Sequence, residues 1–188
     1  MDSIERRMEY LRLKLEDESF LSNKGLSNEV GIYIFAYQPQ EEMAVRAFVR
    51  ELIKGYNGQS GRSRAIVYDM YTILTDICAQ RRVLDRLPEF EEQKGRDKLM
   101  GQVQMLAPPE EYVKKIQYAP HLRGDVVMIT GVGKVYPYMR SHNILNNLQH
   151  LFPDVPVILF YPGTFNGLTL TLFGKFMDDH YYRAFNLI

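Results

Sequence analysis

Two apolar runs, Asp125-Val-Val-Met-Ile-Thr130 and Val155-Pro-Val-Ile-Leu-Phe-Tyr161, decide the fold of this chain. Between them lie Gly131-Val-Gly-Lys-Val-Tyr-Pro-Tyr138 and a helical pattern over residues 139–150. Short β-rich runs bounded by Gly and Pro are typical of strands that are buried on both faces. Two such strands joined by a helix predict parallel pairing and a right-handed crossover.

The functional residues of such a unit are expected where its strands end. Ligand and partner sites of open parallel sheets lie beyond the carboxyl ends of the strands. In this chain those ends carry residues 130–134 and 161–166. We therefore expect the working edge of the protein at these two segments.

The rest of the chain alternates between strand and helix patterns. Further strands are predicted at 31–37, 64–69, 168–172 and 181–188, and further helices at 4–16, 41–54, 70–82, 89–106 and 110–118. This alternation predicts an α/β fold, a single domain with a mainly parallel sheet of about five strands flanked by helices. Residues 1–24 are expected to form an amphipathic helix and its connection, and residues 25–188 the sheet core.

The composition is that of an ordinary globular protein. A hydrophobic share of 46% in 188 residues supports one sizeable core. The 23 basic residues balance 23 acidic ones, so no overall field favours nucleic acid. The single cysteine, Cys78, allows no intrachain disulfide and fits a reducing compartment. No leader or membrane-spanning run is evident, and we expect a soluble, cytoplasmic protein that does not enter membranes.

The loop Gly131-Val-Gly-Lys134 invites comparison with a phosphate-binding loop. A Walker A motif needs a glycine at 128 and a hydroxyl at 135, where this chain has Met128 and Val135. A working Walker A motif is therefore excluded. Two interpretations stay open: a tight strand-to-helix turn, or an anion site formed by backbone N–H groups at Gly131 and Gly133 together with Lys134.

Polar residues follow both strand ends. Tyr136-Pro137-Tyr138 predicts a helix start, which brings Arg140 and His142 close together at its first turn. Arg140 and His142 can hold an anion or a partner's carboxylate, although a histidine of this kind can equally be structural. Beyond the second strand, Phe165 precedes Asn166 in a glycine-bounded loop, and its ring is either a lid over the core or an anchor for a partner.

No complete catalytic or metal-binding pattern is found. Adjacent residues on an extended chain point to opposite faces, so Asp178-Asp179-His180 would need Asp69 or Asp125 to complete a metal site. A Gly-x-Ser-x-Gly nucleophile elbow is absent, and Cys78 falls on the apolar side of a helix. We expect no catalytic residue, no metal and no cofactor.

Long, unusual motifs along nearly the whole chain resemble a known family. They are Thr130-Gly-Val-Gly-Lys-Val-Tyr-Pro137, Arg140-Ser-His-Asn-Ile-Leu-Asn-Asn-Leu148, Val157-Ile-Leu-Phe-Tyr-Pro-Gly163, Leu172-Phe-Gly174, Asp179-His-Tyr-Tyr-Arg-Ala-Phe-Asn-Leu-Ile188 and, nearer the start, Phe20-Leu21, Gly25-Leu26-Ser-Asn-Glu29 and Tyr33-Ile-Phe-Ala-Tyr37. Together these motifs resemble the BrxB family, a small component of bacteriophage-exclusion (BREX) defence systems.

The resemblance implies a role in blocking phage propagation without a known catalytic activity. It also implies partners within the system, which includes a DNA methyltransferase, a large ATPase and a phosphatase-like PglZ protein; PglZ is the first partner we would name. The order of elements is similar to a degenerate P-loop-type nucleotide-binding fold. In that comparison Tyr37-Gln-Pro-Gln40 replaces the phosphate loop, and Thr130 stands where the magnesium-binding acid would be.

These observations lead to a primary hypothesis and two alternatives. The primary hypothesis is a non-enzymatic adaptor that binds BREX components through its carboxyl-end rim, defined as residues 130–142 and 161–166. Its candidate contacts are Lys134, Tyr136, Arg140 and His142 on one side and Phe165 and Asn166 on the other.

The first alternative is a nucleotide- or phosphate-binding regulator that uses Gly131, Gly133, Lys134 and Arg140. Direct DNA binding, through Arg62 and Arg64 or through Arg81, Arg82 and Arg86, is disfavoured by the neutral charge. The sequence leaves the oligomeric state open.

Overall fold

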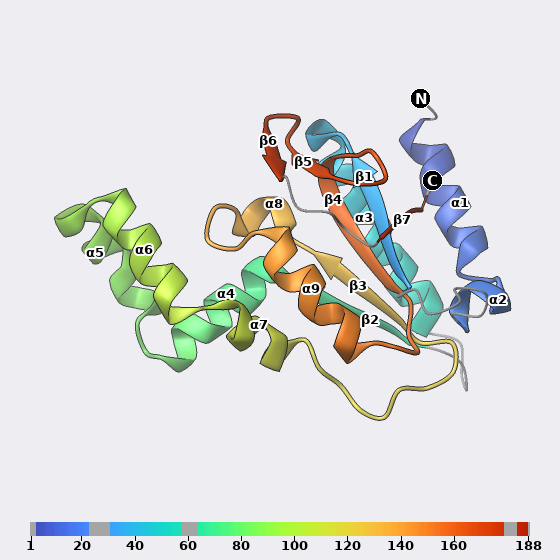
Figure 1. Cartoon of the computed structure of the whole chain (residues 1–188), viewed down its shortest axis with the longest axis horizontal. Helices are drawn as coiled ribbons and strands as arrows, with labels where there is room; N and C mark the ends of the chain where they lie inside the picture. Colours follow the sequence, from blue (N-terminus) through green and yellow to red (C-terminus); the bar gives the residue numbers. More distant parts are fainter. Residues whose placement is uncertain (1–2, 23–30, 58–63, 179–183, 188) are drawn as a thin grey trace.

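The computed structural model of the chain describes residues 3–22, 31–57, 64–178 and 184–187 (Figure 1). In chain order the elements are α1 (Ile4–Lys14), α2 (Glu18–Leu21), β1 (Ile32–Tyr37), the 3-10 helix η1 (Pro39–Glu41), α3 (Glu42–Asn57), β2 (Ala65–Asp69), α4 (Met70–Gln80), the 3-10 helix η2 (Leu84–Arg86), α5 (Leu87–Lys94), α6 (Arg96–Leu106), α7 (Pro109–Lys115), β3 (Val126–Thr130), α8 (Val132–Val135), α9 (Ser141–Leu151), β4 (Val157–Phe165), β5 (Leu170–Leu172), β6 (Phe176–Asp178) and β7 (Phe185–Asn186).

The strands form one sheet with a parallel body and an antiparallel extension. The body has the order β2-β3-β4-β1-β7, and all its neighbouring pairs are parallel. β4 continues beyond the body to pair antiparallel with β5, which pairs antiparallel with β6. The predicted parallel unit is confirmed, because Val127 of β3 lies opposite Val157 of β4. The α/β fold with a mainly parallel sheet is thus confirmed, whereas the likeness to P-loop folds stays a prediction.

Helices cover both faces of the sheet, as buried parallel strands require. On one face α1 and α3 pack against side chains such as Phe35 and Phe160. On the other face α4, α7 and α9 cover side chains of opposite strand parity, such as Ile34 and Leu159 (Figure 1). β3 is the most deeply buried strand: the residues from Val126 to Ile129 are fully inaccessible. The continuous apolar run in the sequence therefore reflects burial on both faces.

The predicted helix over 89–106 is divided in two. Gly95 ends α5 and precedes α6 with φ 83° and ψ 165°, a backbone conformation that is essentially restricted to glycine. The two helices turn back on each other and project away from the sheet (Figure 1). The mixed charges of this segment thus lie on a helical hairpin at one end of the molecule.

The helix predicted over 139–150 begins later than expected. After β3 the chain first forms the short helix α8, whose Val132 and Val135 side chains are buried. Residues 136–138 then form a turn, and α9 begins at Ser141. The prediction that Pro137 lies in the first turn of the helix is therefore wrong. The side chains of Val132 and Val135 are buried, so the chain forms the short helix α8 against the core before α9 begins at Ser141.

The end of the chain contains one strand more than predicted. β4 continues past its predicted end because Gly163 has no side chain: a Cβ atom there would lie 2.1 Å from the carbonyl oxygen of Thr171. β5 confirms the predicted strand at 168–172, whereas β6 was not predicted. Within the predicted strand at 181–188, the described residues form β7, and the other residues lie outside the described part of the chain.

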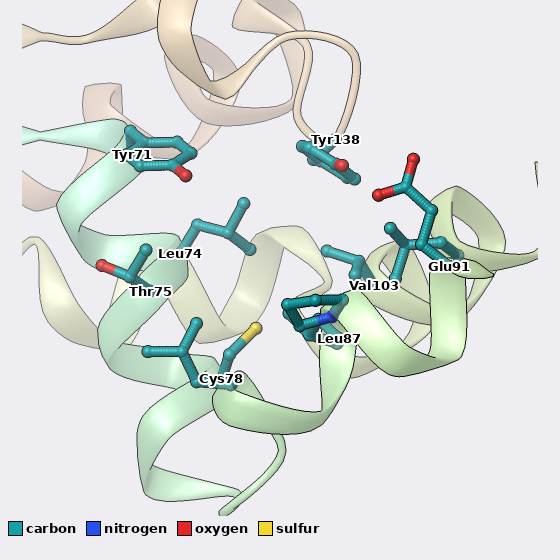
Figure 2. Close-up of a pocket in the computed structure, with 11 residues that line it drawn as sticks. Tyr71, Leu74, Thr75, Cys78, Leu87, Glu91, Val103 and Tyr138 are labelled. Atoms are coloured by element: carbon teal, nitrogen blue, oxygen red, sulfur yellow. The ribbon is translucent and has the colours of Figure 1, made fainter. Parts of the chain in front are cut away.

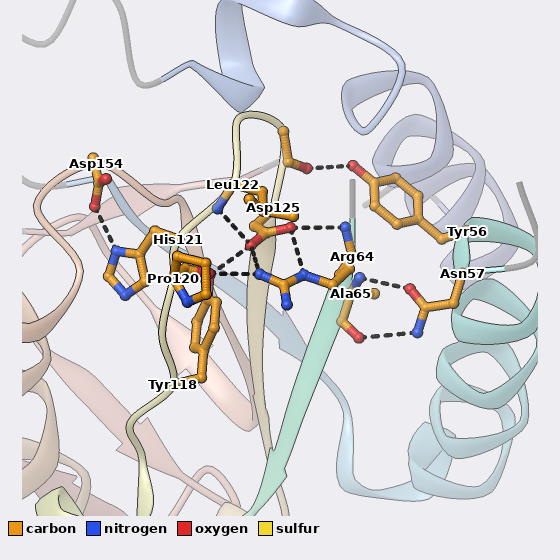
Figure 3. A network of polar contacts seen from close by, with 11 residues as sticks. Tyr56, Asn57, Arg64, Ala65, Tyr118, Pro120, His121, Leu122, Asp125 and Asp154 are labelled. Carbon is orange, nitrogen blue, oxygen red and sulfur yellow. Dashed lines mark hydrogen bonds and ion pairs between the residues drawn. The ribbon is translucent and has the colours of Figure 1, made fainter. Parts of the chain in front are cut away.

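A polar network closes the opposite, amino-end edge of the sheet. The buried carboxylate of Asp125 precedes β3 and binds Arg64, which precedes β2 (Figure 3).

None of the helices in the described residues combines the length and the apolar character needed to cross a membrane.

Candidate functional site

A cavity of about 280 Å³ opens at the carboxyl-end rim, between the turn at 136–141 and the β5–β6 hairpin. We call it the rim cavity. Tyr136, Arg140 and Ser141 line one wall, and residues 175–178 line the other. Its floor includes Tyr161, whose buried side chain comes from β4. The cavity therefore lies at the edge where the sequence predicts function.

Two basic side chains flank the rim cavity. Arg140 and Lys175 are both exposed, and both line the cavity. Among the described residues, neither side chain has a hydrogen-bond or ion-pair partner. This pair gives the opening a positive character that the balanced overall charge conceals.

A histidine–carboxylate pair fixes the wall behind these cations. His142 Nδ1, at the start of α9, lies 2.9 Å from Asp178 Oδ2 on β6. Both side chains are largely buried, with exposed fractions of 14% and 12%. His142 therefore joins α9 to the hairpin, which supports the structural interpretation of this residue.

An aromatic cluster holds the hairpin from the other side. The rings of Tyr136 and Phe176 lie 4.9 Å apart, and Phe173, at the hairpin tip, meets both rings edge-on at 6.4 and 6.5 Å. Such ring pairs add about 0.5–1.5 kcal/mol each beyond simple burial. Tyr136, predicted as a contact residue, thus also supports the cavity wall.

Lys134 is engaged on the far side of α8. Its ammonium group binds the carboxylate of Asp69 at the end of β2. Asp69 also caps α4 by accepting hydrogen bonds from the N–H groups of Tyr71 and Thr72. Burial acts to raise the pKa of the Asp69 carboxyl, but the hydrogen bonds from Lys134 and Thr72 outweigh it and hold this pKa below its usual value.

The same carboxylate changes the interpretation of the glycine loop. Gly131 has φ 75°, and a Cβ atom built on it would lie 2.7 Å from Asp69 Oδ1. An acidic side chain thus lies against the loop where an anion site would need open space. Gly133 packs against Phe173 and Pro162, since a Cβ atom there would lie 3.0 Å from each. These contacts favour the turn interpretation over an anion site at Gly131, Gly133 and Lys134.

Phe165 and Asn166 do not form an exposed contact pair. Phe165 is 9% exposed and belongs to the core, which favours the lid interpretation over an accessible partner contact. Asn166 closes the β4–β5 connection: its Oδ1 accepts hydrogen bonds from the N–H groups of Leu168 and Thr169 at 2.9 and 2.7 Å. Its side chain is used locally in the turn.

Sequence reasoning missed Lys175 and β6 because it did not predict the hairpin. The signal was present: Phe173-Gly174 follows the alternating strand β5, and a glycine in a short connection is a hairpin marker. It also treated Asp69 only as a supplementary metal ligand. Its contact with the loop at 131–134 follows from the pairing of β2 with β3, which the sequence pattern alone does not give.

A second cavity of about 280 Å³ lies between α4 and the α5–α6 hairpin. Figure 2 shows the apolar side chains of Leu74, Leu87 and Val103 lining the cavity, with Tyr71 on α4 and Tyr138 on the facing loop set apart from each other across its opening. Cys78 is 1% exposed, and burial raises the pKa of its thiol. Its burial confirms the predicted place of Cys78 on the apolar side of a helix.

The candidate metal ligands are dispersed. Asp178 binds His142, Asp69 binds Lys134 and Asp125 binds Arg64. Asp179 and His180 lie outside the described residues. Within the ranges that the structure describes, no group of three or more potential ligands converges.

The fold and site together define a class of protein. It is an α/β protein with a mainly parallel sheet. At its carboxyl-end rim most of the charged side chains described above bind one another, and two basic side chains line the open rim cavity. Residues 66–187 match the family model described as BREX protein BrxB.

Full-length relatives agree with the family match. A BREX protein BrxB from Bacillus cereus (strain H3081.97) is 40% identical over 196 residues, covering 100% of this chain and 99% of the relative. A BREX protein BrxB from Escherichia coli O9:H4 (strain HS) is 28% identical, covering 98% and 92% of the two chains. No solved structure matches the chain significantly. The chain belongs to the BrxB family, as the motif resemblance predicted.

Proposed function

We propose that the protein is a non-catalytic adaptor in a BREX anti-phage system and binds another component through the rim cavity. One observation carries this proposal: Arg140 and Lys175 line an open cavity at the carboxyl edge of the sheet without partners among the described residues. Cations left unpaired beside a cavity are free to bind carboxylates of another chain.

Exposed apolar side chains next to these cations support an interaction surface. Phe176 and Met177 are 45% and 66% exposed on β6. A phenylalanine and a methionine beside two basic groups give the mixture of apolar contact and charge that is enriched at protein interfaces. By contrast, Asp69 and His142 bind Lys134 and Asp178 within the chain.

Membership of the BrxB family implies other BREX components as partners, and a PglZ-like protein is the first candidate. The test is to purify the tagged chain from cells that carry the complete system and to identify the bound proteins by mass. Recovery of a PglZ-like protein or another BREX component in stoichiometric amount would support the adaptor. Recovery of the chain alone would contradict it.

An anion-binding regulator is the second candidate, and the same two cations favour it. The contacts of Gly131 and Lys134 with Asp69 favour Arg140 and Lys175 over the glycine loop as the residues of a phosphate site. A ligand that binds only the folded state raises the melting temperature. Millimolar ATP, GTP or inorganic phosphate should therefore stabilise the chain if this candidate is correct, and an unchanged melting temperature would reject it.

A further inference from the structure

β6 is an exposed edge strand beside the rim cavity. Among the described strands it pairs with β5 alone, and residues 175–178 form one wall of the cavity. Figure 1 shows β6 at the outer end of the β5–β6 hairpin, near α8. An edge strand presents backbone N–H and C=O groups that can pair with another extended chain. Which of these groups face outward depends on the register of the hairpin.

The register of the β5–β6 hairpin determines which backbone groups face each neighbouring strand. In an antiparallel strand, the N–H and C=O groups of successive residues point alternately to the two neighbouring strands. The N–H group of Phe173 donates to the carbonyl of Pro162, so the residues in register with it, such as Thr171, direct their backbone groups toward β4. Leu170 and Leu172 then face β6, where Asp178 and Phe176 are their partners.

Met177 is therefore the residue of β6 whose backbone faces the open edge. It lies opposite Thr171, whose own backbone groups bind β4, so β5 offers Met177 no bond. In the described part of the chain, no backbone hydrogen bond joins residues 136–141 to residues 176–178. The rim cavity thus lies along an edge that has room and unused donors and acceptors.

The charges of the cavity specify what kind of chain would add to this edge. Arg140, from the opposite wall, and Lys175, beside β6, line the cavity, and neither side chain has a hydrogen-bond or ion-pair partner among the described residues. Asp178, the one acidic side chain in the lining, is engaged with His142. A carboxylate on the added strand would therefore meet two cations.

We propose that the partner binds by strand addition: an extended, acidic segment pairs with the backbone of Met177, and one of its Asp or Glu carboxylates binds Arg140 and Lys175. This inference rests on the proposed adaptor function and specifies its partner segment. Main-chain pairing supplies affinity in this mode, and the side-chain contacts supply specificity.

Two variant pairs separate the backbone contact from the charge contact. Met177→Pro removes the outward N–H without removing a bond to β5, whereas Met177→Ala keeps that N–H and shortens the side chain. Arg140→Gln with Lys175→Gln removes both charges on the surface. Lys54→Gln is the matched control, because Lys54 is an exposed lysine in the last turn of α3, far along the chain from the rim.

The first measurement is recovery of the BREX component that the unaltered chain captures. The second uses overlapping short peptides that cover the sequence of that component, titrated against the full chain by fluorescence anisotropy. We expect an acidic peptide to bind, with affinity about tenfold lower for Met177→Pro and for the double charge variant. Met177→Ala and Lys54→Gln should retain affinity within about twofold. Melting curves of each variant serve as the control that it is folded.

The outcomes distinguish the inference from the function on which it rests. Capture of no BREX component by the unaltered chain would overturn the adaptor and the inference together. Capture that survives both Met177→Pro and the double charge variant would leave the adaptor standing and overturn strand addition. Binding that is lost equally with Met177→Ala would show a side-chain contact only, and would also overturn it.

Discussion

Arg64 and Asp125 bind each other through both backbone and side chain, and in doing so align the amino ends of β2 and β3. The Arg64 N–H donates to Asp125 Oδ1 at 2.9 Å, and its guanidinium donates to Oδ2 at 2.6 Å. Leu122 N–H and Tyr118 Oη–H also donate to this carboxylate, as Figure 3 shows. Asp125 is 1% exposed, so it is a buried charge with its hydrogen bonds satisfied.

Replacing Asp125 with Asn should cost much of this stabilisation. The amide keeps the shape but loses the charge, and its NH2 group faces donors where the carboxylate accepted hydrogen bonds. We expect urea unfolding to show a loss of about 3 kcal/mol. Asp154→Asn is the control, because that carboxylate is 64% exposed beside His121 and its loss should cost less than about 1 kcal/mol. Equal losses in the two variants would contradict the assignment.

The same carboxylate predicts how stability depends on pH. Burial acts to raise the pKa of Asp125, but hydrogen bonds from Arg64 and from the backbone hold this pKa below its usual value. Because the folded pKa lies below the unfolded one, the contribution is complete above the unfolded pKa, about 3.9, and disappears as the pH falls through the folded pKa. Melting temperatures should therefore hold steady toward pH 5 and fall below about pH 4. A reduced acid dependence in Asp125→Asn would confirm the source, and an unchanged one would refute it.

Gly131 and Gly101 should respond in opposite ways to alanine. At Gly131 a Cβ atom would meet the Asp69 carboxylate at 2.7 Å, and φ 75° is unfavourable for any side chain. We expect Gly131→Ala to lower the free energy of unfolding by about 1–3 kcal/mol. Gly101 lies inside α6 with nothing within 4 Å, so Gly101→Ala should raise it by about 0.5–1 kcal/mol. Chemical denaturation of both variants tests the pair, and a stabilising Gly131→Ala would contradict the geometry.

His142 and His150 provide a matched comparison on one helix. His142 contacts Asp178 and thereby joins α9 to β6, whereas His150 is exposed at the other end of α9. His142→Ala should loosen the hairpin, so that amide hydrogen exchange at residues 176–178 becomes faster while exchange in β3 changes little. His150→Ala should leave both regions unchanged. If the hairpin exchanges at the same rate in all three proteins, the contact does not hold it in place.

The sequence predicts the body of the fold better than its carboxyl-end rim, for a physical reason. Buried parallel strands such as β3 must be apolar throughout, and that requirement is visible in a single run of residues. The extension of β4 depends instead on the absence of a side chain at Gly163 opposite the Thr171 carbonyl, a contact across the β4–β5 hairpin that the alternation within either strand does not show. The Asp69–Lys134 pair likewise follows from which strands are neighbours, and strand order is not written in either local pattern.

The hairpin tip supplies a test in which glycine should be more stabilising than alanine. Phe173 has φ 55°, a conformation that costs a non-glycine residue about 1–2 kcal/mol, yet its ring packs on Tyr136 and Phe176. Removing the ring should destabilise the protein in both Phe173→Ala and Phe173→Gly, because the aromatic contacts are lost. Glycine removes the backbone cost as well, so Phe173→Gly should be more stable than Phe173→Ala by about 1 kcal/mol. At an ordinary position the order is reversed, because glycine has more conformational entropy to lose on folding. Thermal and urea unfolding of the two variants decide the matter, since a more stable alanine variant would mean that the backbone at the tip is not left-handed.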